Sequence, residues 1–367
     1  MDQWLNLFLC GDVMTGRGVD QVMPYPSNPM LYESYVKNAK DYVELAKQVN
    51  GHIPQPISFD YIWGDALTII KKADARIINL ETSITRRNNY FNKGINYRMH
   101  PKNIPCLTVA AIDCCTLANN HVLDWGEEGL LETFKTLQKA GIKYTGAGNN
   151  IFDAEAPCIL QIKGKGRVLV FSYGLPSSGI PNSWRATENS PGVNLLPDLS
   201  LRTAQNISEK IAAFKQPDDL VIASIHWGGN WGYEISEQQK KFAHALIDLG
   251  GIAVIHGHSS HHVKGLEVYK NKLIIYGCGD FLNDYEGISS HEDYRGDLGL
   301  MYFVTSNPVN GRLISLKMVP TQIKKFQITH PNKKDCNWLQ LVLNREGKQF
   351  GTGVEWDDNC TLDLIWD

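Results

Sequence analysis

The sequence predicts an α/β fold, because short apolar runs alternate along the chain with segments that have the period of a helix. Such alternation is typical of βαβ units built around a parallel sheet. Seven runs have the length and composition of buried strands: residues 5–10, 76–80, 113–118, 168–172, 220–226, 252–256 and 273–276. Between them, residues 127–140 place Leu130, Phe134 and Leu137 on one helical stripe, which ends at Gly141.

Another helix is expected to begin at Ser236, which has the spacing of a capping box with Gln239, and to end at Gly250. Two longer stretches interrupt the alternation: 23–60, with an expected helix at 32–49, and 175–200. Long loops on an α/β frame often cover a site, although both stretches also suit plain surface loops. We find no linker, so we expect residues 1–367 to form a single domain with these two insertions covering its site.

Composition excludes several classes of protein. The chain is 43% hydrophobic and 20% charged, as in globular proteins, and its net charge of −3 gives no basic field for nucleic acid. We see no signal peptide and no apolar stretch near the roughly 20 residues that span a bilayer. The eight cysteines form no Cys-x-x-Cys pair. We therefore expect reduced core thiols and a cytoplasmic protein, with a disulfide framework or thiolate metal site as the alternative.

Polar side chains that can bind metals follow several of the expected strands, at the point where each strand ends. Ligands of α/β sheets lie outside the carboxyl ends of the strands, so these side chains should share one pocket. Carboxylate, amide and imidazole ligands together suit Mn, Fe or Zn better than Ca or Mg. The candidate residues are Asp12, Glu81, Asn120, His121, His226, His258 and His261.

Each of these residues alone has an ordinary structural explanation. An aspartate after a strand is usually a helix cap, and an Asn-His pair is usually a turn. Residues 256–262 differ, because four of the seven are histidines, which favours metal binding or catalysis over a surface loop. We interpret the remaining histidines in polar surroundings as solvated: His52, His244, His291 and His330. Residues 93–98, before His100, are a candidate substrate-facing wall.

The motifs at the strand ends resemble those of one family. They are Gly-Asp-Val-Met at 11–14, Asn-Leu-Glu-Thr at 79–82, Ala-Asn-Asn-His at 118–121, His-Trp-Gly at 226–228 and Gly-His-x-x-His at 257–261. With Leu-Asp-Trp-Gly at 123–126 and Gly-Cys-Gly-Asp-Phe at 277–281, the set is similar to the CapA family of poly-γ-glutamate capsule-synthesis proteins, a branch of the calcineurin-like metallophosphatase superfamily. The resemblance implies a four-layered α/β/β/α sandwich with a dinuclear metal site.

The resemblance also assigns roles to individual residues. It implies that Asp12 is a metal ligand and catalytic residue, and that His121 assists the leaving group or stabilises developing charge. It implies that the remaining ligands are Glu81, as the bridging carboxylate, with Asn120, His226, His258 and His261. The chain departs from the superfamily where Met14 replaces a ligand histidine and where Asn79-Leu80-Glu81 replaces Gly-Asp-x-x-Asp.

A thioether does not replace imidazole for a hard divalent ion, so one of two sites should be weaker. We expect one firm site for Mn, Zn or Fe at Glu81, Asn120, His226 and His258. The second, weaker site would use Asp12, Glu81 and His261.

A bound divalent ion can activate water and polarise a carbonyl or phosphoryl oxygen. The resemblance favours a hydrolase that acts on a small peptide or poly-γ-glutamate-type amide, with Arg17 and Arg98 as candidates to bind substrate carboxylates. Two alternatives remain open: a metal-dependent peptide epimerase of the lasso-peptide pathway type, and a non-catalytic accessory protein of capsule synthesis. The sequence leaves the oligomeric state undetermined.

Overall fold

Two β-sheets face each other in the computed structural model, which describes residues 4–288, 291–357 and 361–367. The larger sheet has the order β19-β20-β17-β16-β1-β2-β5-β6, with β15 paired to β1 and β18 to β17. Its strands are β1 Leu5–Val13, β2 Ala75–Leu80, β5 Cys114–Thr116, β6 Lys143–Thr145, β15 Asp280–Leu282, β16 Leu298–Ser306, β17 Leu313–Lys324, β18 Gln327–Thr329, β19 Thr352–Trp356 and β20 Leu362–Trp366.

The smaller sheet has six strands in the order β13-β14-β12-β11-β9-β8. Its strands are β8 Cys158–Ile162, β9 Gly166–Gly174, β11 Leu220–His226, β12 Val254–His258, β13 Leu266–Tyr269 and β14 Lys272–Ile275. The runs β1-β2-β5-β6 and β9-β11-β12-β14 are parallel, which confirms the predicted βαβ organisation. Two small pairs complete the strands: β3 Ser83–Ile84 with β4 Arg98–Met99, and β7 Ala147–Gly148 with β10 Gly192–Val193.

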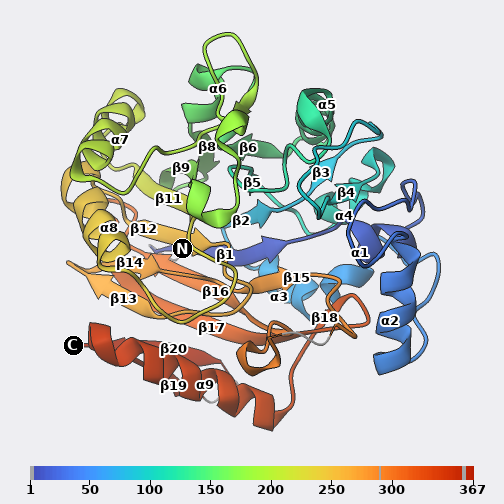
Figure 1. The fold of residues 1–367 in the computed structure, drawn as a ribbon. Coiled ribbons are helices and arrows are strands. Elements are labelled where there is room, and N and C mark those ends of the chain that lie inside the picture. Colours follow the sequence, from blue (N-terminus) through green and yellow to red (C-terminus); the bar gives the residue numbers. More distant parts are fainter. Residues whose placement is uncertain (1–3, 289–290, 358–360) are drawn as a thin grey trace.

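Helices cover the outer faces of both sheets (Figure 1). The α-helices are α1 Arg17–Val22, α2 Lys40–Asn50, α3 Leu67–Ile70, α4 Pro105–Thr108, α5 Gly126–Lys139, α6 Ile151–Glu155, α7 Leu201–Phe214, α8 Glu237–Gly250 and α9 Lys333–Gly347. Short 3-10 turns lie at Tyr61–Ala66, Pro101–Asn103, Pro176–Ser178, Asn182–Trp184, Glu292–Tyr294 and Lys348–Phe350.

Three apolar cores separate the layers. Leu7 and Leu9 of β1 pack between the sheets with Val168 and Val170 of β9. The alternate residue Phe8 belongs to the core between the larger sheet and its helices. A third core lies between the smaller sheet and the helices α7 and α8. The order helix, sheet, sheet, helix confirms the expected four-layered α/β/β/α sandwich of metallophosphatase type.

The helix predicted at 32–49 is shorter than expected, since α2 begins only at Lys40. Before it, Glu33 is buried and binds Arg17, which holds this part of the chain in an irregular path. The predicted strands differ from the observed ones by a few residues at their ends, where β1 continues through Asp12 and β12 through His258. The helix α9, of 15 residues, was not predicted. The capping box of Ser236 and Gln239 is present as predicted.

The larger sheet depends on a close backbone approach at Gly11. A Cβ atom at this position would lie 1.6 Å from the carbonyl oxygen of Gly279, which directly precedes β15. This contact brings β15 beside β1, and the amide of Asp12 donates to the Gly279 carbonyl at 3.2 Å. Asp12 and Asp280 are consequently paired in register.

Gly11→Ala should therefore separate β15 from β1 and lower the free energy of unfolding by about 3 kcal/mol, as overpacking does in a tight core. Gly229→Ala is the matched control, because its nearest atom lies 4.0 Å away in an exposed turn. Chemical denaturation of both variants tests the expectation. Equal stability of the two variants would contradict it.

Candidate metal centre

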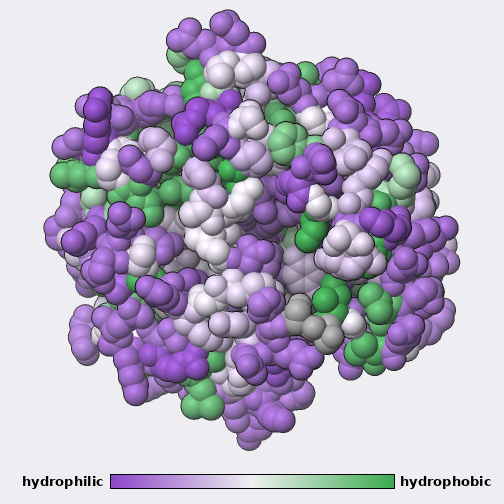
Figure 2. Space-filling model, viewed as in Figure 1, coloured by the Kyte–Doolittle hydropathy of each residue, from purple (hydrophilic) through white to green (hydrophobic). Residues whose placement is uncertain are grey.

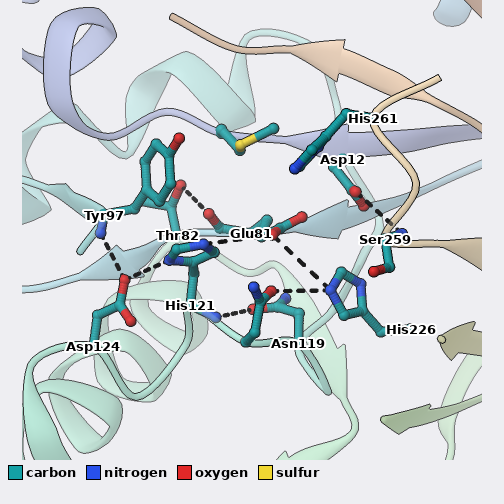
Figure 3. A network of polar contacts seen from close by, with 12 residues as sticks. Asp12, Glu81, Thr82, Tyr97, Asn119, His121, Asp124, His226, Ser259 and His261 are labelled. Carbon is teal, nitrogen blue, oxygen red and sulfur yellow. Dashed lines mark hydrogen bonds and ion pairs between the residues drawn. The ribbon is translucent and has the colours of Figure 1, made fainter. Parts of the chain in front are cut away.

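The sheet strands bring the predicted site residues together at their carboxyl ends. Asp12 lies near the end of β1, Glu81 directly follows β2, and His226 and His258 are the last residues of β11 and β12. His226 and His258 are paired in register across the smaller sheet. Figure 3 shows Asp12, Glu81, His121, His226 and His261 converging from these separate segments on one buried space.

The first compact group contains Asp12, His226 and His258, whose ligand atoms all lie within 4.8 Å of one another. Nδ1 of His258 is 3.7 Å from Oδ1 of Asp12 and 2.8 Å from Nδ1 of His226. On its other side, Nε2 of His226 lies 2.9 Å from Oδ1 of Asn120 and 4.0 Å from Oε1 of Glu81. The four residues expected for the firm site are thus neighbours, with Asp12 added to them.

The second compact group contains Asp12, His261 and Asp280. Nδ1 of His261 is 2.8 Å from Oδ1 of Asp280, whose other oxygen accepts a hydrogen bond from Asn283 at 2.7 Å. The family resemblance implied that Glu81 is the carboxylate common to both sites. In the structure the compact groups share Asp12 instead. Met14, which replaces the usual histidine, is buried with its sulfur 3.6 Å from the hydroxyl of Tyr285.

The electrostatics of the centre favour a bound cation. Burial, together with the charge of Asp280, raises the pKa of Asp12 to about 7, and burial raises the pKa of Glu81 well above its usual value. Among the described residues, the direct ion-pair partners of these three carboxylates are histidines. Oε2 of Glu81 is buried, and in the described part of the chain it accepts no hydrogen bond from an amide, hydroxyl or cationic group.

Burial also lowers the pKa of His226 and of His258, so both imidazoles are neutral at pH 7 and can offer a lone pair. Neutral imidazoles beside several buried carboxylates are the donor set of a first-row divalent ion. The residues present therefore fit such an ion.

A chain of hydrogen bonds sets the tautomer of His258. Nε2 of His256 lies 2.7 Å from the carbonyl oxygen of Cys10, which can only accept, so His256 carries its proton on Nε2. Its Nδ1 lies 3.1 Å from Ser224 Oγ, whose single proton can go to this nitrogen or to Thr116 Oγ1 at 3.2 Å, and in either case Ser224 accepts from Nε2 of His258 at 2.8 Å. With Nε2 of His258 donating to Ser224 and Nε2 of His226 donating to Oδ1 of Asn120, the two Nδ1 atoms face each other at 2.8 Å, where their lone pairs could bind a cation.

Asp12 is oriented in a similar way by its neighbours. Asn79 Nδ2 donates to its Oδ1 at 2.7 Å, and the backbone amide of Ser259 donates to Oδ2 at 3.2 Å. Ser259 has a φ of 99°, in the region that favours glycine, so the turn after His258 is strained. Strain of this kind persists when the surrounding contacts fix the backbone firmly.

His121 forms a second polar arrangement beside the carboxylates. Its Nδ1 lies 2.6 Å from Oδ2 of Asp124, so Nδ1 carries the proton and Nε2 points toward Oε1 of Glu81 at 3.7 Å. Asp124 also pairs with Lys93 at 2.9 Å, and Lys93 donates to the backbone carbonyl of Asn120. Burial lowers the pKa of His121 to about 4, so the ring is neutral at pH 7 and can accept a proton.

Arg17 does not offer a free cation to a substrate. Its side chain is 1% exposed and pairs with Glu33 at 2.9 Å and with Asp284 through two nitrogens. The guanidinium carbon also lies 4.0 Å from the ring centre of Tyr42 and 4.5 Å from that of Tyr97. Its contacts make Arg17 an anchor for the wall of the site.

Arg98 is directed away from the converging ligands. Its guanidinium donates to the backbone carbonyls of Arg87 and Asn28 and stacks over the ring of Trp125 at 3.8 Å. Burial lowers the pKa of this guanidinium. The structure therefore does not bring Arg98 into the candidate centre.

The other histidines mostly stand apart from the centre, as expected. His52 and His330 are exposed. Two others are not simple solvated residues: His291 is exposed but stacks on Trp231 in a pocket that His261 also lines, and His244 is half-buried and pairs with Glu267 at 2.7 Å. Both long stretches contact the site surroundings: Glu33 of the first binds Arg17, and Ser178 of the second donates to the His226 carbonyl.

Sequence reasoning missed several residues that the structure adds to the centre. Asp124 and Asp280 lie in motifs that had been noted at 123–126 and 277–281 but had been given no role. An aspartate three residues after His121, and one ending a Gly-x-Gly-Asp run, were the available signals. His256 belongs to the histidine-rich segment 256–262 but had been given no role of its own. Ser224 gave no signal, because a strand interior does not reveal which buried residue faces a ligand.

The fold and these side chains define a metallophosphatase-like α/β protein with a buried carboxylate–imidazole centre. Residues 6–285 match the family described as "Bacterial capsule synthesis protein PGA_cap", and the chain belongs to this family.

The chain is also similar in sequence to several curated proteins. The chain is 43% identical, over 98% of its length and 96% of the relative's, to a protein of Mycobacterium tuberculosis named "probable polyglutamine synthesis accessory protein". It is 25% identical, over 76% of its length and 60% of the relative's, to the capsule biosynthesis protein CapA of Bacillus anthracis. A Bacillus subtilis protein named PGA biosynthesis protein CapA is 27% identical over 77% of the chain and 64% of its own length.

The helices and the cysteines can also be compared with what the sequence predicted. None of the helices in the described part of the chain has the length and apolar character needed to cross a bilayer. Six buried cysteines have free thiols, as expected: Cys10, Cys106, Cys114, Cys115, Cys158 and Cys278. Cys360 lies outside the described residues.

Ser224→Ala should weaken metal binding without unfolding the protein, because His258 loses the acceptor that sets its tautomer. Loss of such a partner typically costs about 10- to 100-fold in metal affinity. Ser172→Ala is the matched control: Ser172 is paired in register with Ser224 and equally buried, but its hydroxyl has no hydrogen-bond partner. Calorimetric titration with Mn²⁺ or Zn²⁺ measures both, and equal affinities would contradict the assignment.

Metal affinity should also rise with pH. In the metal-free protein Asp12 keeps its proton up to about pH 7, so below that pH a divalent ion must displace it. We expect the affinity to increase by up to about tenfold per pH unit between pH 6 and pH 7 and less steeply above. Titrations in buffers of different ionisation enthalpy should detect proton release at pH 6. A pH-independent affinity would show that Asp12 takes no part.

Proposed function

We propose that the chain is a metal-dependent hydrolase that cleaves a peptide or poly-γ-glutamate-type amide in polymer or capsule metabolism. The observation that carries the proposal is the buried set of carboxylates and neutral imidazoles around Asp12, with His121 beside it. Membership in the capsule-synthesis family, and relatives named for polyglutamine synthesis or PGA biosynthesis, support an amide polymer over a phosphoester.

The residues that would hold the metal are Asp12, Asp280, His226, His258 and His261, with Glu81 and Asn120 completing the surroundings. A bound divalent ion would supply an activated water molecule and polarise the scissile carbonyl oxygen. We propose Mn, Zn or Fe on the basis of the mixed carboxylate and imidazole donors.

His121 is proposed as the residue that handles the proton. Because Asp124 holds the proton of Nδ1, the lone pair of Nε2 faces the carboxylate of Glu81 and the space between the ligands. In this position Nε2 can take a proton from the attacking group and return it to the leaving amine. Asp124 and Lys93 act through His121 as positioning residues, since both contact its Nδ1 side.

A non-catalytic accessory role is the second candidate, because the Mycobacterium tuberculosis relative carries that description. In this reading the metal would organise the ends of β1, β11 and β12 without turnover. We also propose the cytoplasm as the compartment, supported by the buried free thiols, which are typical of reducing surroundings.

The central test uses three alanine variants. His226→Ala should lose the metal, because it removes a ligand of the first group, whereas His121→Ala should keep the metal and lose most turnover, typically 100-fold or more for a general base. His244→Ala is the control, since this histidine pairs with Glu267 instead. Elemental analysis measures the metal, and a cleavage screen of poly-γ-glutamate, short peptides and a phosphodiester measures turnover.

Running the screen in heavy water separates the alternatives. Cleavage of an amide supports the proposal, whereas deuterium at Cα without cleavage would establish an epimerase in its place. Phosphodiester cleavage alone would reject the amide substrate. A protein that binds metal but turns over none of the substrates favours the accessory role. Full activity of the His121→Ala variant would remove His121 from the mechanism.

A further inference from the structure

A pocket of about 620 Å³ opens beside the second group of ligands. His261 of that group lines it, together with Arg17, Asn283 and Tyr285. Figure 2 shows that the face turned to the viewer, from which the site strands are seen in Figure 1, is hollowed near its middle. A substrate that reaches the centre from this side would place its flanking segment in the pocket.

Aromatic rings form one wall of the pocket: Tyr35, Trp231 and Tyr285. Trp231 is half-buried and stacks on His291, with ring centres 4.6 Å apart, and its ring centre lies 5.4 Å from that of His261. Tyr35 is 64% exposed. Faces of tryptophan and tyrosine rings attract cations as well as apolar groups.

Both arginines that line the pocket are already neutralised by two carboxylates each. Arg17 pairs with Glu33 and Asp284, as described above. Arg295 makes a two-pronged contact with Asp297, at 2.8 and 2.9 Å, and a third contact with Asp335 at 2.7 Å. Neither guanidinium is therefore available to bind a carboxylate of a substrate.

Two further carboxylates, those of Glu286 and Glu292, also line the pocket. Glu286 accepts from the backbone amides of Lys325 and Phe326, and Glu292 is exposed. The pocket therefore combines aromatic faces with three carboxylates, and both of the arginines that line it are already paired.

We infer that this pocket binds an ammonium-bearing segment of a peptide, such as an amino terminus or an amine side chain, and not the free carboxylates of a glutamate polymer. The inference deepens the proposed function, since it specifies what lies beside the scissile amide. The ammonium group would lie against Trp231 and near the Arg295–Asp297 pair, and the chain would continue past His261 to the ligands. A glutamate polymer would have to leave the site on another side.

Calorimetric titration of the metal-loaded protein tests the inference with two probes of equal length and opposite charge, 1,5-diaminopentane and glutarate. The diamine should bind, and Trp231→Ala should weaken it about fivefold or more by removing the cation–π face. Asp297→Asn should weaken the diamine about threefold by lowering the negative charge. Asp248→Asn is the control, because Asp248 of α8 pairs with Lys270 and does not line the pocket.

Binding of glutarate that depends on Trp231, or failure of the diamine to bind, would overturn the inference. Glutarate bound through the metal alone would be insensitive to Trp231→Ala and would leave the inference standing. Metal content and amide cleavage are measured separately, so the two proposals can fail independently. An unaltered thermal unfolding temperature in the Trp231→Ala variant confirms that its weaker binding is not a loss of fold.

Discussion

The buried carboxylate of Asp12 is the constraint on which the rest of the candidate centre depends. It belongs to both compact ligand groups, and hydrogen bonds from Asn79 and Ser259 fix its two oxygens. Taking three carboxylates out of water is costly unless a positive charge compensates them. The neutral imidazoles of His226 and His258 do not supply that charge, and His261, whose pKa Asp280 raises, pairs with only one of the carboxylates, so this buried space could hold a cation.

Much of this arrangement could be predicted from the sequence, because it follows from the carboxyl ends of parallel strands. The runs before Asp12 and Glu81 were readable as buried strands, and their parallel alignment in the larger sheet places both residues at one edge. His226 ends a strand of the smaller sheet, so its place beside them depends on the packing of the two sheets. The sharing of Asp12 could not be predicted in this way. It depends on β15, whose three residues lie beside β1 only because Gly11 permits the close approach.

The arginines show where sequence reasoning fails. Arg17 and Arg98 lie close to the motifs along the chain, and their charge suggested substrate binding. In the structure both guanidiniums are bound by residues far away in the sequence: Asp284, which binds Arg17, lies 267 residues from it. Asn28 lies 70 residues from Arg98. The position of an arginine near a motif suggests that it can bind a carboxylate. Whether its guanidinium is free to bind a substrate depends on the residues that contact it in the folded chain.

The antiparallel strand β16 covers an edge of β1 that would otherwise be open to other molecules. It pairs with β1 from Leu5 to Leu9, yet it begins at Leu298, beyond the segment that matches the family. A fragment that ended at residue 285 would leave one side of β1 with unpaired amides and carbonyls, and such open edges recruit strands of other molecules. Strand β16 therefore keeps the backbone groups of β1 from pairing with other molecules, and the solubility of the part that carries the candidate centre depends on strands that follow it in the chain.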